Sequence, residues 1–98
     1  MAMAMPTITH HPASVTAPEG ATATFTVTVT LPPGTAGGIT YQWQSRAPGA
    51  PNFVDIVGAN AASFTTPVLA AADNNAAWRA RVTNAGDTAD SHEAVVTV

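Results

Sequence analysis

Histidine and serine are the residues of this 98-residue chain whose chemistry an enzyme or a metal site would use first. His10 and His11 are adjacent, so on a strand they point to opposite faces and cannot hold one ion together. His92 lies on a different segment and follows Ser91 directly, which makes the two side chains of that pair face apart. Ser91 also lacks the glycine pattern of a nucleophile elbow. We therefore expect exposed strand histidines, no metal site and no catalytic residues.

Acidic and glycine-rich segments also provide no pattern of a metal site or an active site. The segments "DTAD" (87–90) and "DNN" (73–75) offer oxygen ligands, but neither has the spacing of a calcium loop, and turn formation explains them more simply. No glycine-rich phosphate cradle follows a strand and opens a helix. The chain has no cysteine, which excludes thiolate sites and thiol nucleophiles. The sequence predicts a protein that is not an enzyme and carries no cofactor.

Two arginines and two glutamines form the one pattern that favours ligand binding. Arg79 and Arg81 lie two apart in "AAWRARVTN", and Gln42 and Gln44 lie two apart in "ITYQWQ". If these segments pair as neighbouring strands, the four side chains share a face that could bind a carboxylate or a sugar. An ordinary solvated sheet face is the alternative.

Composition limits the class of protein. Hydrophobic residues make up 46% of the chain and charged residues only 9%, with no lysine and a net charge of −3. Such a balance argues against a partner that is a nucleic acid or an anionic membrane, because both require a basic patch. No apolar run approaches the length of a membrane span. Threonine, serine, asparagine and glutamine must provide most of the surface polarity.

Alternation of apolar and polar residues with a period of two recurs along the chain, whereas helical periodicity does not. Glycine, proline and asparagine turns separate the alternating segments, and one short run, "VLAAADNNAA", favours a crossover with a single helical turn. This pattern predicts one all-β domain, an antiparallel sandwich or barrel. The expected strands are 7–10, 13–17, 21–31, 39–46, 53–57, 62–66, 77–84 and 90–98.

Five motifs occur in a recognisable order. An extended start, "PTITHHPASVTAPEG", has Pro12 at a kink and Gly20 at a turn, and "YQW" follows at 41–43. The later motifs are "IVGANAASFTTP", "DNNAAWR" and "VTNAGD". Their order and spacing resemble the immunoglobulin superfamily, above all the bacterial and phage Ig-like type related to the I-set. The resemblance implies an Ig-like two-sheet antiparallel β-sandwich of about seven or eight strands in Greek-key order. It covers residues 7–98 and leaves 1–6 as an apolar N-terminal arm.

The departures from that family concern its core. The two positions of the inter-sheet disulfide map to Val27 and Ala80, so only packing can replace the covalent bond, with Trp43 expected over the pair. Asn75 stands where the family usually has glycine, and asparagine tolerates a positive φ. The predicted core residues are Phe25, Val27, Tyr41, Trp43, Phe64, Trp78, Ala80 and Val82.

The segment "ATATFTVTVTL" (21–31) has an apolar residue at every odd position and threonine at every even one. One interpretation is an ordinary half-exposed strand, since threonine suits a pleated surface and cross-strand threonine pairs help a sheet. The other is a contact face for a neighbouring subunit, because a charge-poor flat face is cheap to desolvate. The candidate contact residues are Thr22, Thr24, Thr26, Thr28 and Thr30, together with Met1, Met3 and Met5 of the arm.

Three functions remain as hypotheses. The first is a non-enzymatic structural or binding module: an accessory (decoration) protein of a tailed-phage particle, docked on head or tail proteins and aiding weak attachment to cell-surface glycans of the host. The second is an Ig-like spacer or adhesion module excised from a secreted bacterial multidomain enzyme or adhesin. The third, a minimal hydrolase, requires a pocket with convergent polar groups. The expected location is the virion, or the cell exterior for the second hypothesis.

Overall fold

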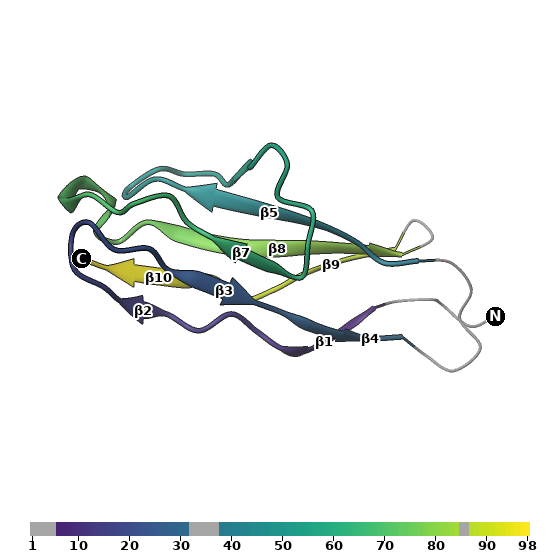
Figure 1. Cartoon of the computed structure of the whole chain (residues 1–98). Helices are drawn as coiled ribbons and strands as arrows, with labels where there is room; N and C mark the ends of the chain where they lie inside the picture. The colour runs from purple at the N-terminus through teal and green to yellow at the C-terminus, as the bar shows by residue number, and fades with distance from the viewer. Residues whose placement is uncertain (1–5, 32–37, 85–86) are drawn as a thin grey trace.

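The computed structural model describes residues 6–31, 38–84 and 87–98, and all its regular structure apart from one 3₁₀ turn is β (Figure 1). The strands are β1 (Thr7–His10), β2 (Val15–Thr16), β3 (Thr24–Thr26), β4 (Thr28–Thr30), β5 (Thr40–Arg46), β6 (Val54–Asp55), β7 (Ser63–Thr65), β8 (Ala77–Asn84), β9 (Asp87–Asp90) and β10 (Ala94–Thr97). The 3₁₀ turn η1 (Ala71–Asp73) occupies the crossover before β8, where one helical turn was expected.

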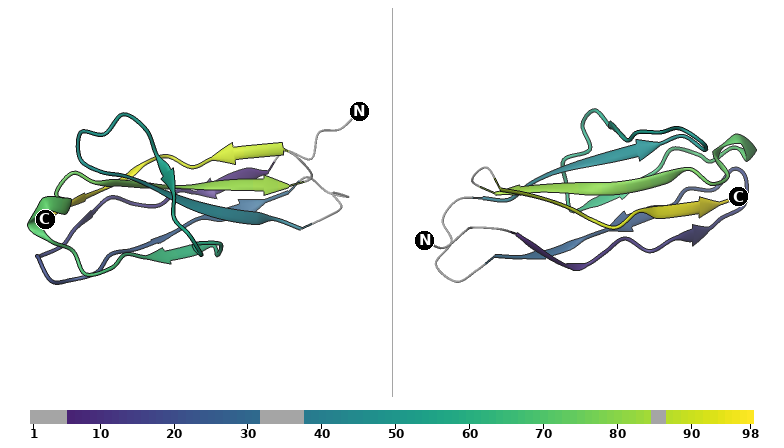
Figure 2. Two further views of the ribbon diagram at one scale, coloured as in Figure 1. Left: turned by 90° about the horizontal axis from the view of Figure 1, so that it is seen from above. Right: turned by 180° about the vertical axis from the view of Figure 1, so that it is seen from behind.

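The strands form the two layers of an Ig-like β-sandwich (Figure 2). In one layer β1 pairs with β4 and β3 pairs with β7. In the other, the order is β2-β10-β8-β5-β6, with β9 also paired to β8. Every pairing is antiparallel except β2 with β10. The chain changes layers between β1 and β2, at the segment that contains the buried Pro12. The all-β sandwich predicted from the sequence is therefore confirmed.

The longest ladder joins β5 and β8 over seven residue pairs, from Thr40↔Thr83 to Arg46↔Ala77. Residues along β8 alternate between buried and half-buried, because successive side chains of a strand point to opposite faces. Trp43 lies directly opposite Ala80 in this ladder. The pairing therefore places Trp43 beside Ala80, one of the two positions that the resemblance to immunoglobulin domains assigns to a disulfide.

Aromatic rings fill the space between the layers. Trp43 has no exposed surface, and its indole N–H donates a hydrogen bond to the Ala61 carbonyl at 2.7 Å. The Phe25 ring lies 5.4 Å from the Trp78 ring, and the Phe64 ring lies 6.1 Å from Trp43. Of the eight predicted core residues, six are buried, while Tyr41 and Phe64 are half-buried and pack against the same cluster; the six are Phe25, Val27, Trp43, Trp78, Ala80 and Val82.

Two predicted strands are interrupted. The expected strand 21–31 divides at Val27 into β3 and β4, because the segment leaves β7 there and begins to pair with β1. The expected strand 90–98 starts too late: pairing with β8 already begins at Asp87 in β9, and only β10 lies within the expected range. The strand is interrupted between β9 and β10, where the Ser91 hydroxyl accepts the Ala80 N–H at 2.9 Å in place of a backbone carbonyl. The shorter strands β2, β6 and β7 lie within their expected ranges.

Asn75 adopts φ 74°, a left-handed conformation of the kind that the resemblance to immunoglobulin domains led us to expect there. Of the predicted arm, Pro6 is buried, and residues 1–5 lie outside the described part of the chain.

Candidate interaction surfaces

The outer side of the layer that contains β1, β3, β4 and β7 carries hydroxyl groups and the exposed His10, which pairs with Thr28, but no carboxylate or guanidinium group. All five threonines of the 22–30 row are exposed, and the alternating apolar residues between them point inward. The Thr24 and Thr65 hydroxyls lie 3.0 Å apart, and those of Thr26 and Ser63 lie 3.1 Å apart. We call this surface the threonine face; it comprises Thr7, Thr9, Thr22, Thr24, Thr26, Thr28, Thr30, Ser63 and Thr65.

These hydroxyls partly satisfy one another across the strands. The Thr9 hydroxyl also donates to the Thr28 carbonyl, at 3.3 Å. Because the paired groups keep their hydrogen bonds when water leaves, covering this surface costs less than covering a charged one. The other predicted contact residues, Met1, Met3 and Met5, lie outside the described residues.

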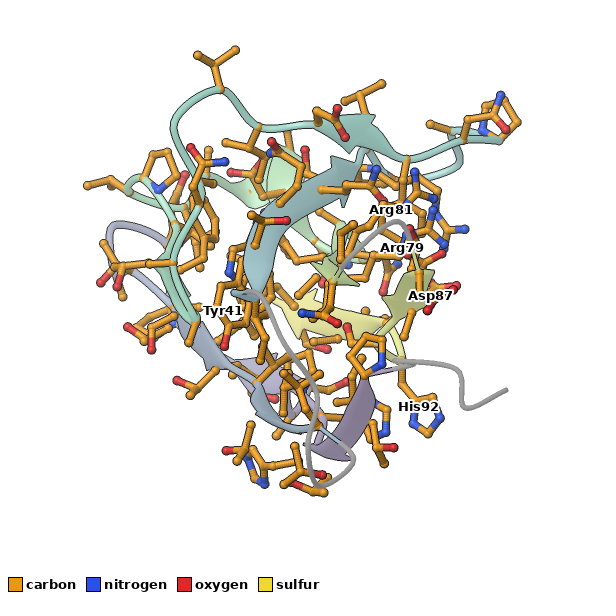
Figure 3. All side chains as sticks on the ribbon, turned by 90° about the vertical axis from the view of Figure 1, so that its right-hand side faces the viewer. Tyr41, Arg79, Arg81, Asp87 and His92 are labelled. Carbon is orange, nitrogen blue, oxygen red and sulfur yellow. The ribbon has the colours of Figure 1, made fainter. Side chains whose placement is uncertain are left out.

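The opposite layer carries every arginine of the chain on its outer side, on β5 and β8. The ladder pairs Gln44 with Arg79 and Gln42 with Arg81, and Figure 3 shows the two arginines lying side by side. Arg79 Nε donates to Gln44 Oε1 at 2.8 Å, and Gln44 Nε2 donates to Asp55 Oδ1 at 2.7 Å. Gln42 instead turns to the backbone, because its Nε2 donates to the carbonyls of Trp43 and Ile56. Of the four predicted residues, only Gln44 and Arg79 are therefore joined directly, while Gln42 bonds to the backbone and Arg81 to Asp90.

Carboxylates on the same side of the molecule form ion pairs with the arginines. Arg81 donates two hydrogen bonds to Asp90, at 2.9 and 3.3 Å, and Arg46 pairs with Glu93 at 2.7 Å. The hydrogen bond from Arg81 lowers the pKa of Asp90 and outweighs the opposing effect of burial; it also raises the pKa of Arg81. An external carboxylate or sugar must therefore compete with Asp90 for these groups.

Phe53 adds an aromatic ring to this surface. The guanidinium carbon of Arg79 lies 4.3 Å from the ring centre and that of Arg46 lies 5.0 Å from it, which is the range of cation–π contact. Sequence reasoning missed Phe53, Asp55 and Asp90 as members of the site. No local pattern links them to Arg79, because the contacts depend on which strands pair. We call the surface formed by Arg46, Phe53, Asp55, Arg79, Arg81 and Asp90 the arginine face.

His11 and His92 meet although they are 81 residues apart. Their rings stack with centres 3.7 Å apart and planes inclined by 6°, and the His92 backbone N–H donates to His11 Nδ1 at 3.0 Å. Burial lowers the pKa of His11, and charge on His92 and then His10 adds to that effect. Parallel stacked rings cannot direct nitrogen lone pairs at one ion. Within the part of the chain that the structure describes, no three histidine or acidic residues gather to hold a metal.

A groove of about 430 Å³ opens between the two layers. It contains one carboxylate, Asp73, whose Oδ2 accepts the Ala70 N–H at 2.8 Å, and its lining includes no histidine or basic residue. The lining residues are Ser45, Ile56, Phe64, Thr65, Thr66, Pro67, Val68, Leu69, Asp73 and Trp78. No sequence pattern predicted this groove, because its walls come from β5, β7, β8 and the segment after β7, which are far apart in the chain.

No helix in the described ranges is long and apolar enough to cross a membrane. No curated protein matches the chain. Residues 9–98 match the family model of a domain of unknown function, DUF8696. The match spans nearly the whole sandwich, from the end of β1 to the last residue of the chain. The chain therefore belongs to the DUF8696 family.

Proposed function

We propose that this domain is a non-catalytic, Ig-like binding module that docks on another protein through its threonine face. Its specific setting in this proposal is a tailed-phage particle, where it decorates head or tail proteins. The observation that carries the proposal is the hydroxyl-rich surface of β1, β3, β4 and β7, which holds no carboxylate or guanidinium group.

The two outer faces of the sandwich differ in the free energy that is needed to remove water from them. Burying the threonine face removes water from neutral hydroxyls, of which Thr24, Thr26, Ser63 and Thr65 already bind one another. Burying the arginine face removes water from guanidinium and carboxylate groups, whose desolvation is far more costly. Docking through the threonine face leaves the arginine face in solvent, where Arg79 and Arg81 can make weak contacts with cell-surface carboxylates or sugars.

The positions of the titratable groups support a binding role over a catalytic one. Asp90 and Glu93 pair with arginines, and Asp55 accepts a hydrogen bond from Gln44. The groove contains a single carboxylate, already bonded to a backbone N–H, and no base that could activate Ser45. A hydrolase needs a nucleophile and a base within hydrogen-bond reach of each other.

A spacer in a secreted bacterial multidomain enzyme or adhesin is the second candidate function. The sandwich is elongated, with extents of 48 × 22 × 20 Å, and β1 begins toward the end opposite to Val98 (Figure 1). This placement suits a rod in which successive domains follow one another.

The docking proposal is tested with a pair of charge variants. Thr24→Lys/Thr28→Lys adds two charges to the threonine face, and Thr40→Lys/Thr88→Lys adds the same charges at exposed threonines of the other layer. Purified phage particles from the native source are incubated with each protein, and bound protein is counted by electron microscopy and sedimentation. We expect the wild type and the Thr40/Thr88 variant to bind and the Thr24/Thr28 variant to lose binding.

Equal binding by the two variants would contradict docking through the threonine face. A wild-type protein that sediments as a monomer, binds no particle and is found only within a longer secreted chain would support the spacer function instead.

A further inference from the structure

Strand β7 has a free edge. It pairs with β3 on one side only, and the described residues provide no strand on its other side. The left view of Figure 2 shows β7 at the outer margin of the molecule. The chain passes from β6 in one layer to β7 in the other without forming another strand between them. The layer of β7 is therefore open at the position where one more strand would fit.

The backbone groups on that edge are available for pairing. The Ala62 carbonyl accepts the Val27 N–H, and the Thr66 N–H donates to the Ala23 carbonyl, so residues 62, 64 and 66 direct their backbone groups toward β3. In an antiparallel ladder, alternate residues direct these groups to opposite sides. The N–H and carbonyl groups of Ser63 and Thr65 consequently point away from β3.

The 430 Å³ groove begins at this edge, because Phe64, Thr65 and Thr66 form one of its walls. Trp78 and Ile56 form apolar parts of the opposite wall, and Val68, which is 66% exposed, lies at the opening. A volume of this size accepts a large apolar side chain. An unpaired edge beside an apolar pocket is the arrangement by which proteins bind an extended peptide as an added strand.

Charge at the groove defines the partner further. Asp73 has no ion-pair partner among the described residues, and the lining contains no cation. The chain has no lysine, and its three arginines lie on the outer side of the opposite layer. A cation that forms an ion pair with Asp73 must therefore belong to the partner, not to this chain.

We propose that the free edge of β7 binds an extended segment of a partner protein as an additional strand. A large apolar side chain of that segment fills the groove, and a lysine or arginine beside it pairs with Asp73. Binding is weak for a single copy, since only Ser63 and Thr65 offer edge hydrogen bonds and Pro67 has no N–H to extend the edge. This edge shares Ser63 and Thr65 with the threonine face, but it uses their backbone groups and not their hydroxyls, and it does not depend on the proposed docking.

The test uses a short synthetic peptide of alternating valine and threonine, with a central phenylalanine followed by lysine. The ¹⁵N-labelled protein is titrated with this peptide and followed by two-dimensional NMR. We expect saturable shifts at the Ser63 and Thr65 amides and slower hydrogen exchange at both. A peptide N-methylated at its pairing positions, or one with serine in place of phenylalanine, should bind about tenfold more weakly or not at all.

Variants of the protein separate the contributions. Asp73→Asn keeps an oxygen acceptor for the Ala70 N–H and should weaken the lysine peptide severalfold, while leaving a glutamine version of the peptide unaffected. Val68→Ser should weaken both peptides. Val57→Ser is the matched control, because Val57 is fully exposed and does not line the groove.

Unchanged Ser63 and Thr65 amides at millimolar peptide would overturn the inference, as would equal binding of the N-methylated peptide. Shifts confined to β1 and β4 would also overturn it. Concentration-dependent self-association through β7 would show that the edge serves a second copy and would contradict a separate partner. None of these outcomes alters particle binding by the Thr24/Thr28 variant, so the two proposals fail independently.

Discussion

At the scale of single residues, Trp43 lies in the core where the resemblance to immunoglobulin domains predicted it, beside Val27 and Ala80. The side chain is fully buried and packs in the same cluster as Val27 and Ala80. Its N–H reaches the Ala61 carbonyl in the segment before β7, so one residue contacts both layers. Packing and a single hydrogen bond, without a covalent bond, therefore connect the two layers at Trp43.

Replacing this ring should be costly. We expect Trp43→Ala to lower the free energy of unfolding by about 3–5 kcal/mol, a large share of the stability of a small domain. Urea denaturation followed by circular dichroism measures the loss. Val57→Ala, at a fully exposed position, should change stability by less than about 0.5 kcal/mol. A loss at Trp43 no larger than that of the control would show that the ring does not support the core.

The histidine stack should make stability depend on pH. Burial and the charges of His92 and His10 hold the pKa of His11 below its usual 6.5 in the folded protein. The unfolded chain therefore takes up this proton first as the pH falls. Stability should be complete above about pH 6.5 and should decrease toward the lower pKa of the folded state. Protonation also removes the lone pair with which His11 Nδ1 accepts the His92 N–H.

Denaturation curves between about pH 7.5 and pH 5.5 measure this dependence. His11→Phe keeps an aromatic ring on His92 and should flatten the curve. His92→Phe removes one repulsive charge from His11 and should leave a smaller slope than the wild type. A slope unchanged in His11→Phe would assign the dependence to another group.

At the scale of strands, the β5–β8 ladder positions both the core and the arginine face. Its register sets Trp43 opposite Ala80 on the inner side and Gln44 opposite Arg79 on the outer side. A shift of the register by one residue would exchange these two sides, because side chains alternate along a strand. The hydrogen bonds among Arg79, Gln44 and Asp55 join neighbouring strands of this sheet on its solvent side.

The pair formed by Asp90 and Arg81 predicts a second dependence on pH, in a more acidic range. Because the folded-state pKa of Asp90 is lowered, its contribution is present above the ordinary carboxyl pKa of 3.8 and is lost as the pH falls through the lower value. Both side chains are partly exposed, so Asp90→Asn should cost at most about 1 kcal/mol near neutral pH. The difference from wild type should disappear in strong acid and shrink in high salt.

Thermal unfolding of wild type and Asp90→Asn across this range measures the effect. Asp87→Asn, on the same strand, is the control for loss of a negative charge alone. Equal effects of the two variants would show that the pairing of Asp90 with Arg81 adds nothing.

At the scale of the whole molecule, the sandwich separates two kinds of surface. One layer presents neutral hydroxyls, and the other presents all the arginines with their carboxylate partners. Between them lies the groove that opens at the edge of β7. The arginine face can therefore be altered without disturbing the other two surfaces, whereas the threonine face and the groove share Thr65.

The relation to immunoglobulin domains can be tested across both layers. We expect Val27→Cys/Ala80→Cys to form a disulfide under oxidising conditions, because the proposed resemblance assigns these positions to the immunoglobulin bridge and both are buried in one cluster. The bridge should raise the free energy of unfolding by about 2–4 kcal/mol. Comparison of oxidised and reduced protein in urea, with mass spectrometry of the thiols, measures both outcomes. Free thiols in the folded, oxidised protein would contradict the proposed equivalence.

Alternation along the chain by itself determined the β class, the inward residues and the exposed threonine row. This is possible because a strand places successive side chains on opposite faces, so Phe25 and Val27 must share one side and Thr24 and Thr26 the other. The tight turn at Asn75 could also be predicted, because few residues accept its left-handed backbone.

Only the tertiary structure decided which segments meet. The His11–His92 stack, the link from Arg79 through Gln44 to Asp55, and the walls of the groove all join residues far apart in the sequence. The break at Val27 depends on a change of partner strand, and the break at Ser91 depends on a hydrogen bond that its hydroxyl accepts from Ala80 of another strand. A local pattern predicts which face of its sheet a side chain lies on. The residues that it contacts depend on which distant segments pair as strands.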